Sequence, residues 1–311
     1  MRVLLPFADS AEAERRLGGI PDGIEVDCYR GDDDWPASVA DVELYVLPYL
    51  KSAEVVLSRV GQMTSLRVVQ TLTAGYDNFL PHLSPGITLC NAAGVHDAST
   101  AELAVALALT SGRRLDQFAR QQTEGRWAPR LGTSLADRRV LILGYGRIGA
   151  AIERRLSGFE VASVIRVARS ARSGEVEVHA VTELPALLPT AEVLIVIAPL
   201  TPQTDGLLDA RALALLPDDA LVVNVARGRL LDTDALLAET SSGRLRSALD
   251  VTEPEPLPPE HPLWRVPGVF ISPHVGGAST AFFPRADRLV SAQLRRFAAG
   301  QPLDNIVSQG T

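Results

Sequence analysis

The chain has 311 residues, of which 46% are hydrophobic and 22% are charged, a balance typical of a globular protein of about two domains. Its net charge of −7 argues against nucleic acid as a main partner, because phosphate binding requires a basic surface. Two cysteines, Cys28 and Cys90, are too few for a disulfide framework or a cysteine zinc site. Its apolar runs are too short for a signal peptide or a membrane span, and the few cysteines favour a reducing compartment, so we expect a cytoplasmic protein. We expect no metal site.

The first part of the chain alternates short apolar runs with helical segments. We expect strands at 2–7, 42–47, 67–71 and 87–91, and helices at 11–17 and 53–60. Strands that alternate with helices form a parallel sheet. Because ligands bind at the carboxyl edge of such a sheet, the loops 48–51 and 73–77 are candidate ligand-binding segments.

A long helix is expected from Ser99 to about Arg114. Residues 103–109 are apolar on nearly every side, which is typical of a helix buried between domains or between subunits. We interpret this helix as the crossing between two domains and as part of a homodimer surface. A core helix packed within one domain is an equally good interpretation.

A glycine turn follows, in the context expected of a dinucleotide site. Residues 140–143 form a buried strand, Gly144, Gly146 and Gly149 have the spacing G-x-G-x-x-G, and a helix begins after them. Gly144 permits the tight turn, Gly146 lets backbone N–H groups approach a pyrophosphate, and Gly149 allows close helix–strand packing. The start of the helix favours phosphate through its partial positive charge.

The remaining elements suit a second parallel sheet. Strands are expected at 161–167, 191–198, 220–224, 246–251 and 269–272, each followed by a loop with polar residues or glycine. An amphipathic helix at 286–299 is expected to pack back on the first domain.

With its second half read in this way, the chain resembles the D-isomer-specific 2-hydroxyacid dehydrogenase family over essentially its whole length. The motifs that carry the resemblance, in family order, are GYGRIG at 144–149, APLTPQT at 198–204, NVARG at 224–228, ALDV with EPEP at 248–256, and SPHVGG at 272–277. The resemblance implies an α/β fold with two Rossmann-like, doubly wound parallel-sheet domains and an interdomain cleft. A substrate-binding domain would comprise residues 1–97 and 283–311, and a dinucleotide-binding domain residues 98–282. Family members are usually homodimers.

The resemblance places the catalytic residues at Arg227, Glu255 and His274. Their residue types suit ketone reduction, because the oxygen of the reduced carbonyl must receive a proton and an imidazole can donate it near neutral pH. A neighbouring carboxylate stabilises the charged ring, and a guanidinium binds a carboxylate or carbonyl through two N–H groups. Glu253 competes with Glu255 for the acidic role, and the spacing from Asp250 favours Glu255.

The resemblance also implies binding residues. The substrate would contact the backbone N–H groups of Ala74 and Gly75 and the loop at Leu50, whereas the role of the neighbouring Lys51 stays open. Asp250 is expected at the nicotinamide carboxamide. The full set expected to bind the cofactor is Gly144, Tyr145, Gly146, Arg147, Ile148, Arg169, Ser170, Pro199, Thr204, Val225, Ala226, Asp250 and Gly276.

The choice of nicotinamide depends on the segment after the second strand of this domain. NAD sites place an acid there, on the ribose 2′-hydroxyl, but the nearest acid in this chain is Glu175. Instead Arg166, Arg169 and Arg172 surround Ser170, and arginine with a hydroxyl suits a 2′-phosphate. We therefore predict NADP(H) in preference to NAD(H), bound by Arg169 and Ser170.

These observations favour reduction of a small 2-keto acid, such as glyoxylate or hydroxypyruvate, to the D-2-hydroxy acid. One alternative is oxidation of a D-2-hydroxy acid such as phosphoglycerate with NAD. Formate oxidation is disfavoured, because formate enzymes of the family have glutamine where this chain has Glu255. The other alternative is a dinucleotide-sensing protein similar to the family's corepressors, against which the presence of all three catalytic residue types argues.

Overall fold

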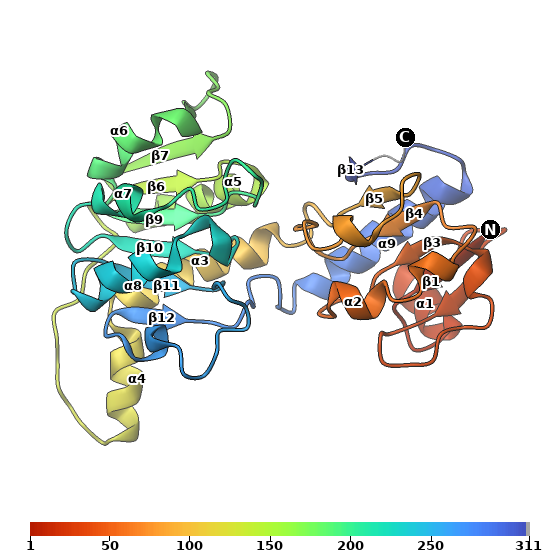
Figure 1. Cartoon of the computed structure of the whole chain (residues 1–311), viewed down its shortest axis with the longest axis horizontal. Helices are drawn as coiled ribbons and strands as arrows, with labels where there is room; N and C mark the ends of the chain where they lie inside the picture. The colour runs from red at the N-terminus through yellow and green to blue at the C-terminus, as the bar shows by residue number, and fades with distance from the viewer. Residues whose placement is uncertain (309–311) are drawn as a thin grey trace. The chain divides into compact units, whose positions relative to one another are not determined.

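The computed structural model describes residues 1–308 and divides into two compact units (Figure 1). The first comprises residues 1–96 together with the C-terminal segment from Thr280, and the second extends from Asp97 to Ser279. Each unit contains one largely or wholly parallel sheet with helices, so the predicted α/β class with two parallel-sheet domains is confirmed. The assignment of the first unit to substrate binding stays a prediction.

The first unit contains a six-stranded sheet of order β13-β5-β4-β3-β1-β2, in which β13 is antiparallel to β5 and the other pairs are parallel. The strands are β1 Arg2–Leu5, β2 Glu25–Cys28, β3 Val42–Val46, β4 Val68–Gln70, β5 Thr88–Cys90 and β13 Ile306–Ser308. The helices are α1 Ser10–Leu17, α2 Ala53–Val56 and α9 Phe282–Ala298, with 3-10 turns η1 Val39–Asp41, η2 Val60–Gln62 and η3 Leu80–His82.

Apolar residues on both faces of this sheet are buried. Along β1, Val3 and Leu5 pack with α1 and α9, whereas Leu4 faces the opposite core with β3 and α2. This alternation follows from the two-residue period of a strand. The apolar stripe of α9 repeats at helical spacing, and Phe282, Ala286, Val290, Leu294 and Phe297 are buried. The prediction that the last helix packs on the first domain is therefore confirmed.

The second unit contains a seven-stranded, wholly parallel sheet of order β12-β11-β10-β9-β6-β7-β8. Its strands are β6 Arg139–Leu143, β7 Ser163–Ala168, β8 His179–Ala180, β9 Val193–Val196, β10 Leu221–Asn224, β11 Arg246–Leu249 and β12 Val269–Ile271. Its helices are α3 Asp97–Gly112, α4 Leu115–Thr123, α5 Arg147–Leu156, α6 Leu184–Leu187, α7 Ala210–Ala214 and α8 Thr233–Ser241. The 3-10 turns are η4 Ser157–Phe159, η5 Val181–Glu183, η6 Leu188–Thr190, η7 Gly228–Leu230 and η8 Pro262–Arg265.

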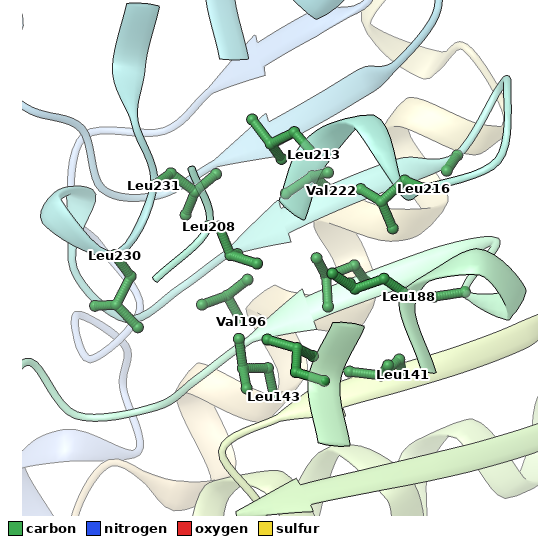
Figure 2. Packing of buried hydrophobic residues seen from close by; sticks show 14 of the residues in the cluster. Leu141, Leu143, Leu188, Val196, Leu208, Leu213, Leu216, Val222, Leu230 and Leu231 are labelled. Carbon is green, nitrogen blue, oxygen red and sulfur yellow. The ribbon is translucent and has the colours of Figure 1, made fainter. Parts of the chain in front are cut away.

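Two apolar layers enclose the second sheet. On one face, leucine and valine side chains from β6, β9 and β10 interdigitate with those of the flanking helices and loops, as Figure 2 shows. On the other face, Ala101, Ala104 and Ala108 of α3 pack with α5 and with Val140 and Ile142 of β6. The helix α3 is therefore a core helix of the second unit, as one of the two interpretations expected, and a role in dimerisation stays a prediction.

The sheet order reverses around β6. The chain leaves β6 in one direction for β7 and β8, and returns to the other side of β6 with β9, β10, β11 and β12. In doubly wound sheets, ligands bind at the carboxyl edge where the order reverses, which here is the end of β6 that carries the glycine turn. Among residues 1–308, no helix has both the length and the apolar character that crossing a bilayer requires.

Candidate active site

Two glycines of the turn after β6 are required by the fold itself. A Cβ on Gly144 would lie 2.4 Å from the backbone nitrogen of Ala198, and this residue has a φ of +110°, in the region that favours glycine. A Cβ on Gly149 would lie 2.5 Å from the carbonyl oxygen of Gly144. These two positions therefore bring β6, β9 and α5 together at one tight turn.

Gly146 differs, because a Cβ there would meet no atom within 4 Å. It is also the N-cap of α5, and no side chain accepts a hydrogen bond from the first turn of that helix. Backbone N–H groups and the helix dipole favour an anion at such a terminus. The open space at Gly146 and the uncapped helix thus fit the pyrophosphate of a dinucleotide.

A depression of about 550 Å³ lies beside this terminus. Its lining is formed by Tyr145, Gly146, Arg147, Arg172, Ser173, Gly174, Glu175, Val176 and Val178. Arg172 donates a hydrogen bond of 2.6 Å to the carbonyl oxygen of Tyr145, and its backbone pairs with that of Val178. The segment after β7 therefore folds back against the glycine turn, and both a cation and the carboxylate of Glu175 face the depression.

Of the three arginines that cluster in the sequence, Arg166 is committed elsewhere. Its guanidinium forms an ion pair with Glu153 of α5 and lies over the ring of Tyr145. Burial alone would raise the pKa of Glu153, but the hydrogen bonds from Arg166 and Tyr145 bring it below its usual value. Arg169 and Ser170, directly after β7, are exposed.

The three predicted catalytic residues follow β10, β11 and β12, three neighbouring parallel strands. Arg227 lies after β10, Glu255 in the loop after β11, and His274 after β12. The Nδ1 atom of His274 lies 2.5 Å from Oε1 of Glu255, and these side chains are 46% and 37% exposed. The structure thus pairs an accessible imidazole with a carboxylate, and Glu253 is not the residue in contact with the ring.

Asp250 holds the loop that carries His274. Its side chain is buried, and its carboxylate accepts hydrogen bonds from Ser272 Oγ (2.6 Å), Val275 N (2.9 Å) and Gly276 N (2.8 Å). The backbone N–H of His274 donates to the Asp250 carbonyl oxygen at 2.8 Å. These hydrogen bonds fix residues 272–276, and the contact of Asp250 with the nicotinamide stays a prediction.

The loops of Arg227 and Glu255 meet through their backbones. The amide of Asn224 donates to the Arg227 carbonyl oxygen at 2.9 Å and accepts from Ala226 N at 3.0 Å, which fixes the start of the first loop. A Cβ on Gly228 would lie 2.0 Å from the carbonyl oxygen of Thr252. The positions of these two loops therefore depend on each other.

The other predicted residues are placed as follows. Thr204 closes the turn after β9 by donating from Oγ1 to the Pro199 carbonyl oxygen at 2.7 Å. Val225 and Ala226 are buried directly after β10, Ile148 lies in the first turn of α5, and the carbonyl oxygen of Gly276 accepts a hydrogen bond from Thr100. Arg147 forms an ion pair with Asp97 at 2.9 Å, so its charge is partly satisfied within the unit.

In the first unit, Ala74 and Gly75 lie half-buried in the loop after β4, and Leu50 is 70% exposed. Lys51 forms an ion pair with Asp32, with Nζ 2.5 Å from the carboxylate. His96, which the sequence singles out for no role, has Nε2 2.8 Å from the carbonyl oxygen of Leu72. Only the order of the elements could have indicated this contact of His96 in advance. His96 follows β5 and Leu72 follows the neighbouring strand β4, so both lie at the same edge of the sheet.

The chain is similar in sequence and fold to known dehydrogenases and reductases. The glyoxylate reductase/hydroxypyruvate reductase of Mus musculus is 36% identical over 225 residues, which cover 69% of each chain. The solved D-isomer specific 2-hydroxyacid dehydrogenase of Xanthobacter autotrophicus, in complex with NADPH and MES, has a TM-score of 0.81 at 28% identity, covering 99% of this chain and 98% of that one. The NADPH-dependent glyoxylate/hydroxypyruvate reductase of Sinorhizobium meliloti, solved with NADP and malonate, has a TM-score of 0.80 at 30% identity, covering 99% and 96%.

The sequence profile of the NAD binding domain of the D-isomer specific 2-hydroxyacid dehydrogenases matches residues 105–276. This range holds the glycine turn, the three strand ends with Arg227, Glu255 and His274, and the buried Asp250. From the matched sequence and the folds it resembles, the chain belongs to the D-isomer-specific 2-hydroxyacid dehydrogenase family.

Proposed function

We propose that this protein reduces a small 2-keto acid, of the size of glyoxylate or hydroxypyruvate, to the D-2-hydroxy acid with NADPH. The observation that carries the proposal is the pairing of His274 with Glu255 at 2.5 Å. These residues follow β12 and β11, and Arg227 follows the next strand, β10, at the same sheet edge. The names of the mouse and Sinorhizobium relatives support the substrate class.

In this proposal His274, protonated at both ring nitrogens, gives the Nε2 proton to the carbonyl oxygen of the substrate. Glu255 accepts from Nδ1, which orients the ring and stabilises its charged form. Arg227 binds the carboxylate or carbonyl oxygen and stabilises the charge that develops there. The nicotinamide, when bound, would supply the hydride to the carbonyl carbon.

The proposed cofactor residues are those around the turn after β6. The uncapped start of α5 and the open side of Gly146 would take the pyrophosphate, and Arg169 with Ser170 would take a 2′-phosphate. Ala74, Gly75 and Leu50 stay the proposed substrate residues of the first unit. We also propose a homodimer, which would cover the apolar side chains of Trp127 and Leu131, now 96% and 94% exposed.

A panel of 2-keto acids, with NADPH oxidation followed by absorbance, tests the proposed activity. We expect turnover of glyoxylate or hydroxypyruvate and a D-configured product on chiral analysis. Tight binding of NADPH without oxidation by any 2-keto acid would contradict the proposal and would favour a dinucleotide-sensing protein.

Gly146 offers a test of the pyrophosphate site that separates binding from folding. Because a Cβ would meet no protein atom, Gly146→Ala is expected to leave the melting temperature unchanged. The same methyl group would occupy the space next to the phosphates, so we expect the Kd for NADPH to rise by about tenfold or more. Equal NADPH affinity in titration calorimetry of the two proteins would show that the pyrophosphate lies elsewhere.

Two single substitutions, one at Arg169 and one at Glu175, test the preference for NADPH over NADH. Arg169→Asp is expected to shift the ratio of kcat/KM for NADPH over NADH toward NADH by about tenfold or more, because a carboxylate repels the 2′-phosphate. Glu175 lines the depression beside the start of α5, and removing its negative charge is the converse change, so Glu175→Gln is expected to favour NADPH further. A wild-type preference for NADH would contradict the proposal.

A further inference from the structure

The loop after β4 holds its carbonyl groups in fixed hydrogen bonds. Four consecutive carbonyl oxygens have partners: Leu72 O faces His96 Nε2 (2.8 Å), Thr73 O accepts from Thr71 Oγ1 and Ala92 N (2.9 Å each), Ala74 O accepts from Asn91 Nδ2 (2.7 Å), and Gly75 O accepts from Thr73 Oγ1 (2.7 Å). A loop whose carbonyl groups are all satisfied from within its own unit has little freedom to rotate its peptide planes.

The backbone N–H groups of Ala74 and Gly75, on the opposite side of two of these peptides, have no acceptor among residues 1–308. In a trans peptide the N–H points away from the C=O of the preceding residue, so the bond to Thr73 O fixes the N–H of Ala74 and the bond to Ala74 O fixes the N–H of Gly75. Both residues are half-buried and accessible. Two adjacent donors are thus held ready for an acceptor from outside the protein.

The two side chains that set these peptides are buried and hydrogen-bonded to backbone groups. Thr71 is 0% exposed and directly follows β4, and Asn91 is 7% exposed and directly follows the neighbouring strand β5. While its Nδ2 donates to Ala74 O, the Oδ1 of Asn91 accepts from Ala93 N at 3.2 Å. Both ends of this amide are committed to backbone groups, so it acts on the loop rather than on a ligand.

We infer that Thr71 and Asn91 are positioning residues that aim the N–H groups of Ala74 and Gly75 at the carboxylate of the 2-keto acid. The inference rests on the proposed function. Successive backbone N–H groups form anion-binding concavities, and their hydrogen bonds to a charged oxygen are stronger than those between neutral groups. The donors bind the carboxylate alike before and during the reaction, so their loss acts on substrate affinity rather than on turnover.

The test uses pairs of substitutions matched in shape. Thr71→Val keeps the volume and removes the hydroxyl, whereas Thr71→Ser keeps the hydroxyl. We expect Thr71→Val to raise the KM for glyoxylate by roughly three- to tenfold, with kcat and the KM for NADPH changed less than about twofold. Thr71→Ser is expected to restore the wild-type KM. Asn91→Leu, which removes the amide that sets Gly75, is expected to raise the same KM independently.

Thr240→Val is the control for the loss of a buried hydroxyl, because Thr240 donates to a helix carbonyl in α8 of the second unit. We expect it to change the melting temperature but not the KM for glyoxylate. A rise in KM for this control similar to that of Thr71→Val would contradict the inference, as would wild-type KM values in both Thr71→Val and Asn91→Leu.

Oxalate, a dicarboxylate that resembles a 2-keto acid, separates this inference from the proposed function. If none of the 2-keto acids supports NADPH oxidation by the wild-type protein, the proposed function fails. The positioning role of Thr71 is then tested by the Kd for oxalate in titration calorimetry. A weaker Kd in Thr71→Val and recovery in Thr71→Ser would still support the positioning role. Failure of the wild-type protein to bind oxalate, or equal Kd values in all variants, would overturn it.

Discussion

His274→Asn is expected to lower kcat by about 10²- to 10⁴-fold, the usual contribution of a positioned general acid. Asparagine retains a hydrogen-bond donor of similar reach but cannot transfer a proton to the carbonyl oxygen. The KM for NADPH is expected to stay within about twofold, because the glycine turn and α5 do not involve this residue. Steady-state kinetics with saturating NADPH measures both constants.

Two further variants make this experiment specific. Glu255→Gln keeps a partner for Nδ1 and removes the charge, so the loss in kcat should be smaller than that of His274→Asn. His82→Asn is the matched control, since His82 is exposed and lies in η3 of the first unit, and no loss is expected from it. A kcat for His274→Asn within about threefold of wild type would rule out the assigned role.

Gly228→Ala is expected to destabilise the second unit strongly. The new Cβ would lie 2.0 Å from Thr252 O, 2.1 Å from Thr252 C and 2.6 Å from Glu253 N, all of them backbone atoms that no rotamer change can move. Overpacking of this severity costs about 3 kcal/mol or more. Because the displaced loops carry Arg227 and Glu255, activity should fall together with stability.

Urea denaturation of Gly228→Ala and of Gly158→Ala measures this effect. Gly158 lies in η4, where a Cβ would meet no atom within 4 Å, so its substitution controls for the general effect of replacing glycine. We expect a clearly lower midpoint only for Gly228→Ala. Equal midpoints for the two variants would mean that the loops of Arg227 and Glu255 can separate without cost.

The parts of the fold that could be predicted are those with a strong local pattern. The buried strand β6 and the glycine turn are where the residue pattern places them, because apolar runs and glycines reflect constraints within a few residues. The last helix begins at Phe282, earlier than the expected residue 286, because a proline such as Pro284 is tolerated in a first turn. The expected helix at 53–60 ends at Val56 and continues only as turns.

What could not be predicted depends on partners distant in the sequence. The edge strands β2 and β13 are only partly buried, so neither shows a clear apolar pattern, and β13 exists because its backbone pairs with β5. The arginine cluster at the end of β7 indicates three available cations, but Arg166, within the strand, forms an ion pair with Glu153 of α5, a helix earlier in the chain. Asn91 and His96 likewise acquire their contacts only when the loops after β4 and β5 meet.

The two units differ in whether they are continuous in the sequence, and this affects the order in which they can fold during synthesis. The second unit is one continuous segment, whereas the first needs residues from both ends, since α9 covers the face of its sheet that carries Val3 and Leu5. That apolar face stays without its cover until α9 has left the ribosome, after all of the second unit has been made. We therefore expect the later-encoded unit to mature first, and the N-terminal segment to be the part most in need of chaperone protection while translation continues.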